Sequence, residues 1–188
     1  MILLFVNIMK EEKKFSQIDC HGCGGCISVC PSGAVDYAPS NKEALFEMSK
    51  FYKNTHPLVI PAKMNLENLE VSLKENILPF AIEGEKFLHE ASFLTLLQMS
   101  GSQVIFYSDF LSKGSKDAIK ILNEIYQKRY QKDAILIAMN PKELQKAVEE
   151  ISFVEDSYFN FNQETLKKRE IFSHRLEKIV GNDDLGVI

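Results

Sequence analysis

Several features common in other classes of protein are missing from this sequence of 188 residues. Its longest uninterrupted apolar stretch, residues 1–6, is far shorter than the roughly 18 residues that a membrane-spanning helix needs. That stretch also lacks the preceding positive charges and the small-residue cleavage site of a secretory signal. We therefore expect a strand there, no membrane insertion and a cytoplasmic location.

An excess of positive charge is also missing. The chain has 22 lysines and arginines against 26 aspartates and glutamates, which gives a formal net charge of −4. A protein that binds nucleic acid needs a basic face to meet the phosphates. The charge balance therefore argues against nucleic acid as a partner and suits docking on basic protein surfaces.

Cysteine is absent from most of the chain. All four cysteines lie between Cys20 and Cys30, and none of the 158 residues after Cys30 (188 minus 30) is a cysteine. A small disulfide-stabilised domain spreads its cysteines along the chain to join distant segments, and disulfides within so short a stretch would constrain little else. The pattern indicates a cluster of metal ligands in a reducing compartment.

The spacing of these cysteines is Cys20-x2-Cys23-x2-Cys26-x3-Cys30, and Pro31 follows. It matches the bacterial run that holds a [4Fe–4S] cluster through thiolates. The irons of such a cluster are close together, so consecutive ligands must come from one tightly wound loop. The intervening glycines tolerate positive φ, which lets the loop curl and point its N–H groups at the sulfurs; they are Gly22, Gly24 and Gly25.

Zinc and unliganded thiols are the competing interpretations of the four cysteines. Structural zinc sites of this type usually combine two short cysteine pairs from distant segments. Four cysteines within the range 20–30 cannot easily surround a tetrahedral ion. The sequence therefore favours an iron–sulfur cluster over zinc.

Residues 18–35, including Cys-Pro-Ser-Gly-Ala-Val at positions 30–35, resemble one half of a bacterial-type two-cluster ferredoxin. The resemblance implies that Cys20, Cys23 and Cys26 are ligands of one cluster and that Cys30 is the ligand of the other. More loosely, the whole chain looks like part of the larger multi-cluster ferredoxin proteins of bacteria, in which such motifs flank an α/β segment.

This sequence departs from that family because it has no second cysteine run. Either Cys30 completes the single cluster, or a dimer mate supplies the missing half, or the half belongs to a longer chain. Residues 185–188 look like the beginning of a strand, which is compatible with a longer chain, and the sequence leaves these alternatives open.

Residues after Pro57 alternate between short apolar runs and amphipathic stretches. The runs predict strands at 58–60, 78–82, 104–107 and 134–138, and the stretches between them predict helices at 66–77, 86–99, 116–130 and 141–150. Short strands are also plausible at 14–18 and 34–37. Apolar strands alternating with amphipathic helices indicate a parallel sheet covered on both faces.

Helices are predicted on either side of this region, from Asn41 to about residue 53 and over residues 163–180. The predicted fold class is α/β: a small ferredoxin-like iron–sulfur module, an open, mostly parallel α/β domain and a C-terminal helix. The predicted domains are residues 1–55, 56–152 and 153–188.

The carboxyl ends of the strands are the places where α/β proteins bind ligands. Here these ends are Glu83-Gly84, Ser108-Asp109 and Met139-Asn140. No glycine-rich dinucleotide or phosphate-loop motif follows a strand, and residues 112–115 resemble a phosphate loop only superficially. Apolar residues around the cysteines are expected to shield the cluster from water; they are Ile18, Ile27, Val29 and Val35.

These observations lead to an electron carrier as the first functional hypothesis. The [4Fe–4S] cluster would pass single electrons to and from redox partner proteins within a larger assembly, and no catalytic residue is predicted. The alternative is an oxidoreductase subunit whose α/β domain binds a flavin or a nucleotide, with the cluster as a relay. A cluster that serves structure or oxygen sensing is the third hypothesis.

Overall fold

A four-stranded sheet forms the centre of the computed structural model, which describes residues 23–30, 32, 35, 37, 41–64, 69, 71–159 and 166–181. The strands are β1 (His56–Pro61), β2 (Ile77–Ile82), β3 (Val104–Tyr107) and β4 (Ile135–Ala138). They lie in the order β2-β1-β3-β4, and every pairing is parallel. The predicted α/β fold with a parallel sheet is confirmed. The strands predicted at residues 1–6, 14–18 and 185–188 lie outside the described residues.

The position of each strand in the sheet explains its sequence. All residues of the central strands β1 and β3 are buried, as expected for strands covered on both faces. The edge strands β2 and β4 contain both buried and more exposed residues. Pro79 lies in β2, where the missing N–H is tolerated because one side of an edge strand has no partner strand.

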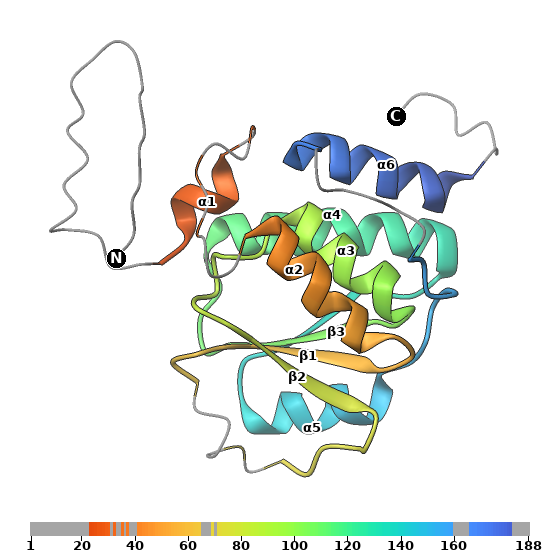
Figure 1. Ribbon diagram of the computed structural model, residues 1–188. Helices are drawn as coiled ribbons and strands as arrows, with labels where there is room; N and C mark the ends of the chain where they lie inside the picture. The colour runs from red at the N-terminus through yellow and green to blue at the C-terminus, as the bar shows by residue number, and fades with distance from the viewer. Residues whose placement is uncertain are drawn as a thin grey trace, which may run out of the picture.

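Helices cover both faces of the sheet (Figure 1). On one face lie α2 (Lys42–Ser49), its extension η3 (Lys50–Tyr52), α3 (Glu90–Ser100) and α4 (Lys113–Tyr130), with α6 (Lys168–Val180) packed outside them. On the other face lies α5 (Pro141–Glu150). The short helix α1 (Gly25–Val29) carries the cysteine motif. In the described residues, no helix has both the length and the apolar character that crossing a membrane requires.

Hydrophobic packing joins helices that precede the predicted α/β domain in the sequence to a helix that follows it. Leu45 of α2, Tyr52 of η3 and Ile179 of α6 belong to the same buried cluster as the apolar residues of α3 and α4. The hydroxyl of Tyr52 also donates to the carbonyl oxygen of Pro79 in the edge strand. The domain boundaries at residues 55 and 152 stay a prediction.

The helix predicted over residues 66–77 is wrong for its described part. Residues 69 and 71–76 are not helical, and β2 already begins at Ile77. Leu69, Val71 and Leu73 recur at every second position, and they pack on the sheet face that α5 covers. The connection is long enough to cross from β1 to the parallel strand β2, and burial of these side chains stabilises it in place of helical hydrogen bonds.

A reciprocal pair of hydrogen bonds fixes α6 on α3. The side chain of Gln98 donates through Nε2 to the carbonyl oxygen of Arg175 at 2.7 Å. Nη1 of Arg175 donates in return to Oε1 of Gln98 at 3.1 Å. Burial lowers the pKa of Arg175 to about 10, so the guanidinium still carries its charge at neutral pH. The pair holds α6 in position and therefore places the first residue of that helix, Lys168.

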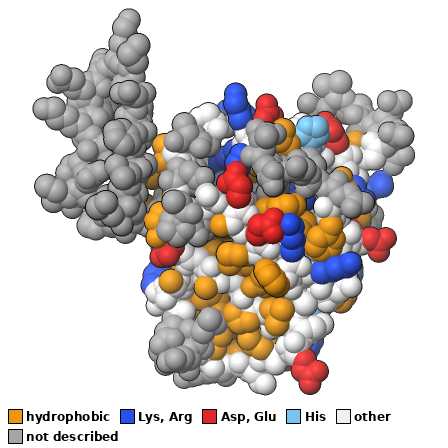
Figure 2. Space-filling view, viewed as in Figure 1, with side chains coloured by type: hydrophobic (Ala, Val, Ile, Leu, Met, Phe, Trp, Pro, Cys, Tyr) orange, Lys and Arg blue, Asp and Glu red, His pale blue; other side chains and the backbone are white. Residues whose placement is uncertain are grey.

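Apolar side chains gather on the face that includes α2 and the edge strand β2 (Figure 2). The exposed apolar residues of α2, η3 and β2 include Met48, Phe51 and Pro79, in that order. Pro79 cannot donate a backbone hydrogen bond to a further strand. The proline therefore limits continuation of the sheet past β2.

Candidate metal centre

Three of the four predicted ligands fall in the described residues, in and around α1. Cys23 is exposed and precedes the helix, Cys26 lies within it, and Cys30 follows its last residue. The Cys30 N–H donates to the carbonyl oxygen of Ile27 at 3.3 Å, and its sulfur lies 3.5 Å from the Ser32 hydroxyl oxygen. None of these three forms a disulfide. Cys20 lies outside the described residues.

Gly24 turns the chain between Cys23 and Cys26. Its φ of 76° lies in the left-handed region, and its carbonyl oxygen accepts from the N–H groups of Ile27 and Ser28. A Cβ at this position would lie 2.4 Å from Cδ2 of Phe87. Only glycine suits this position, because both the backbone conformation and the contact exclude a side chain. The expected positive φ is confirmed at Gly24 and is wrong at Gly25, which begins α1; Gly22 lies outside the described residues.

The cysteine segment, residues 23–30, lies against the edge of the sheet where the strands have their carboxyl ends. Gly84 follows β2, and a Cβ built on it would lie 3.3 Å from the carbonyl oxygen of Cys23. Phe87, from the same loop, packs beneath Gly24 and is 9% exposed. This edge of an open α/β sheet is where ligands usually bind. No local pattern of residues indicates that the cysteines lie there.

The first turn of α6 also contacts the cysteine helix. Nζ of Lys168 donates to the carbonyl oxygen of Ser28, which lies between Cys26 and Cys30 in the sequence. Lys168 is 8% exposed. Burial lowers its pKa, while the charges of Glu90 and Cys30 act to raise it. No motif in the sequence points to this residue, because 138 positions (168 minus 30) separate it from Cys30.

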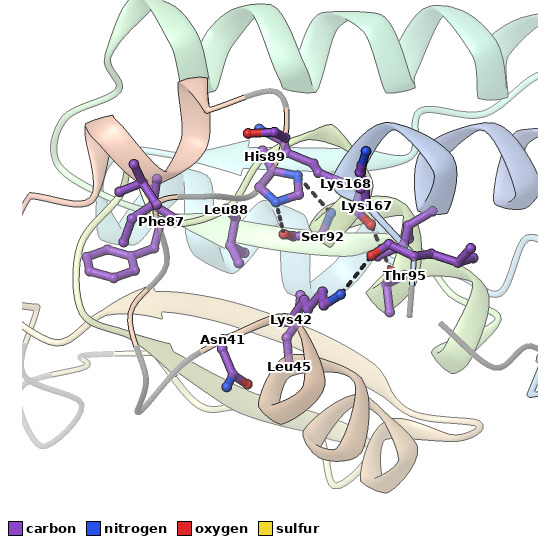
Figure 3. Close-up of a pocket in the computed structure, with 16 residues that line it drawn as sticks. Asn41, Lys42, Leu45, Phe87, Leu88, His89, Ser92, Thr95, Lys167 and Lys168 are labelled. Carbon is purple, nitrogen blue, oxygen red and sulfur yellow. Dashed lines mark hydrogen bonds between the residues drawn. The ribbon is translucent and has the colours of Figure 1, made fainter. Parts of the chain in front are cut away.

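A cavity of about 140 Å³ lies next to this contact, where the N-terminal ends of α2, α3 and α6 meet the cysteine segment (Figure 3). Nζ of Lys42 donates across it to the carbonyl oxygen of Leu166 at 2.7 Å. His89 caps α3 by accepting the N–H of Ser92 at Nδ1, and burial is the main cause that lowers its pKa to about 3. His89 is therefore neutral at physiological pH, and the positive charge beside α1 comes from the lysines.

The predicted hydrophobic shield is present only in part. Ile27 and Val35 are partly buried and line the cavity. Val29 is 73% exposed, so the expectation is wrong for this residue. The single helical turn of α1 directs Ile27 towards the body of the protein and leaves Val29 in solvent. Ile18 lies outside the described residues.

The donor chemistry of this segment fits an iron–sulfur cluster. In the ranges that the structure describes, no group of three or more His, Cys, Asp and Glu side chains is arranged to hold a metal ion. The fit rests on the chemistry of the three thiols in residues 23–30, in and beside α1, and on the left-handed glycine between Cys23 and Cys26. Soft thiolate ligands of this kind select iron–sulfur clusters.

The other strand ends are occupied by local interactions. Asp109 forms a salt bridge with Lys63 at 2.7 Å, and Asn140 caps α5 through the N–H of Glu143. At the start of α4, Oε2 of the buried Glu85 accepts from the Ser115 hydroxyl at 2.6 Å and from the Ser112 N–H at 3.3 Å. A carboxylate thus takes the place that a phosphate would need at this helix N-terminus. The arrangement supports an ordinary helix start at residues 112–115.

In a comparison with protein-family models, residues 14–36 match the model described as a 4Fe-4S binding domain. The matched range contains all four cysteines. Comparison with curated proteins and with solved structures finds no match. The chain therefore carries a ferredoxin-type iron–sulfur motif in residues 14–36, and its cofactor is a [4Fe–4S] cluster.

Proposed function

We propose that this chain is an electron carrier that binds an iron–sulfur cofactor through Cys20, Cys23, Cys26 and Cys30 and exchanges single electrons with redox partner proteins in a larger assembly. The observation that carries the proposal is the match of residues 14–36 to a 4Fe-4S binding domain. Cys23 is exposed, which supports electron exchange at this surface because a partner can approach the ligands closely.

A bound [4Fe–4S] cluster supplies the ability to accept and return one electron. The residues of the chain bind and position it. Gly24 turns the loop, and Phe87 packs against that turn. Ile27 and Val35 limit the access of water on the side that faces the protein body. No observation in the described residues favours the flavin or nucleotide alternative.

Anaerobic purification followed by iron and acid-labile sulfide analysis tests the proposal. We expect both elements, together with an EPR signal after reduction that disappears reversibly on reoxidation. A reversible one-electron cycle distinguishes an electron carrier from a cluster with a purely structural role. Stoichiometric zinc without sulfide would contradict the proposal.

We further propose that the α/β region keeps its fold without the metal, in line with the predicted boundary between residues 55 and 56. The buried residues of β1, β3, α3 and α4 form a core that includes no cysteine. Removing iron with a chelator under reducing conditions should therefore leave the far-UV circular dichroism largely unchanged and preserve cooperative thermal unfolding. Loss of all secondary structure with the iron would show that the whole chain folds around the cluster.

Cys30 is proposed to serve a second cluster rather than the one held by Cys20, Cys23 and Cys26. The backbone supports this, because α1 ends at Val29 and Cys30 leaves the helix in an extended conformation with ψ of 111°. In that case, a second cysteine run would supply the other ligands of this second cluster. That run would come from a dimer mate or from a longer chain. The substitutions that separate the two roles are described in the Discussion.

A further inference from the structure

Lys168 is placed unfavourably for a lysine unless a negative group lies beside it. The residue is 8% exposed, and its ammonium group lies in a partly buried position. It is also the first residue of α6, where the helix dipole is positive and disfavours a cation. Arg169, the next residue, adds a further repulsive charge. Burial in such a place requires compensating interactions.

The structure compensates this charge from two sides. Glu90, at the start of α3, supplies the larger favourable charge, and Cys30 supplies a smaller one. The direct hydrogen bond comes from the cysteine segment, where the carbonyl oxygen of Ser28 in α1 accepts from the ammonium group. The neighbouring imidazole of His89 adds no positive charge that would repel the ammonium group, since it is neutral at physiological pH. The ammonium group of Lys168 thus contacts the segment that carries Cys26 and Cys30.

We propose that Lys168 is a positioning residue that stabilises the reduced state of the cluster and thereby raises its reduction potential. Reduction adds one electron, and hence one negative charge, to a cluster already surrounded by thiolates. A buried cation beside the ligand helix favours the more negative state, because the effective dielectric there is lower than in water. The hydrogen bond to Ser28 also fixes α1 against α6. The proposal rests on the proposed function, since it requires the cluster.

Lys167 provides a matched control. It precedes Lys168 directly and carries the same charge, but its side chain is exposed. Water and dissolved salt screen an exposed charge strongly. Lys167→Met and Lys168→Met therefore remove the same charge from neighbouring positions and differ in burial.

The experiment is a redox titration of the full chain, reconstituted anaerobically with iron and sulfide and monitored by EPR. In Lys168→Met we expect the equilibrium constant for reduction to fall by about tenfold, which for one electron lowers the potential by about 59 mV. Lys167→Met should shift the potential by much less. Lys168→Arg, which keeps the charge, should stay closer to the unsubstituted chain than to Lys168→Met.

The outcomes separate this inference from the proposed function. An unsubstituted chain that holds no iron and sulfide would overturn both. A fully loaded Lys168→Met protein with an unchanged potential, or an equal shift in Lys167→Met, would overturn only the role of Lys168. If Lys168→Met does not retain the cluster, Lys168→Gln takes its place, because glutamine keeps a hydrogen-bond donor without the charge; an unshifted potential in that variant would likewise overturn the inference.

Discussion

Cys23→Ala should leave the protein without its brown chromophore. The exposed Cys23 is expected to supply one of the thiolates that bind the cluster, and alanine offers no donor atom. Iron and sulfide per chain should fall close to zero in anaerobic preparations, while the far-UV circular dichroism of the α/β region stays as in the unsubstituted chain. The visible absorption spectrum and the iron and sulfide analyses provide the measurement.

Ser32→Ala is the control for this substitution. It changes a small exposed side chain beside Cys30 and keeps every cysteine, so its iron content should equal that of the unsubstituted chain. An unchanged content of iron and sulfide in Cys23→Ala would show that Cys23 is not a ligand of the cluster.

Cys30→Ser separates the two possible roles of the last cysteine. If Cys30 serves a second cluster, the isolated chain should hold a labile cluster or a three-iron form, and Cys30→Ser should change its iron content and EPR spectrum little. A stable, full [4Fe–4S] cluster in the monomeric chain that is destroyed by Cys30→Ser would instead make Cys30 a ligand of the same cluster.

Gly24→Ala should impair cluster retention without changing any ligand. An L-residue in the left-handed conformation costs roughly 1–2 kcal/mol, and the new Cβ would lie 2.4 Å from Cδ2 of Phe87. Both effects force the turn between Cys23 and Cys26 to rearrange. We expect a several-fold faster loss of the visible absorption on exposure to a chelator, and a lower iron content per chain after reconstitution.

Gly25→Ala is the matched control, because this glycine lies in α1 and a Cβ there would have its nearest neighbour at 3.4 Å. Its rate of cluster loss should stay near that of the unsubstituted chain. Adding Phe87→Ala to Gly24→Ala should restore retention only in part, because it removes the contact and leaves the backbone strain. Equal rates of loss in the two single alanine variants would show that the left-handed turn does not matter for the cluster.

Periodicity and composition were sufficient to predict most of the architecture. Continuous apolar runs predicted the four strands, and Pro141 correctly predicted the start of α5. Asn41 correctly predicted the cap of α2, where its side chain accepts the N–H of Ala44. These features are local: a strand, a cap or a helix start depends on residues within a few positions of each other. The cysteine spacing is equally local, so it indicated the cofactor without knowledge of the fold.

The failures came where distant residues decide the outcome. The apolar residues between β1 and β2 also suit a helix, and only their burial against the sheet selects the non-helical path. Val29 looks like a shielding residue in the sequence, but the orientation of one helical turn against the protein body leaves it in solvent.

The sequence by itself determined the kind of cofactor and the parallel α/β class, because both follow from short-range patterns of residue type. Only the tertiary structure brought Phe87 beneath Gly24 and placed the buried Lys168 beside the cysteine helix. These contacts join segments about 60 and 140 positions apart, since they depend on how the sheet edge and α6 pack. No local periodicity encodes such a contact, so the surroundings of the cluster are a property of the folded chain.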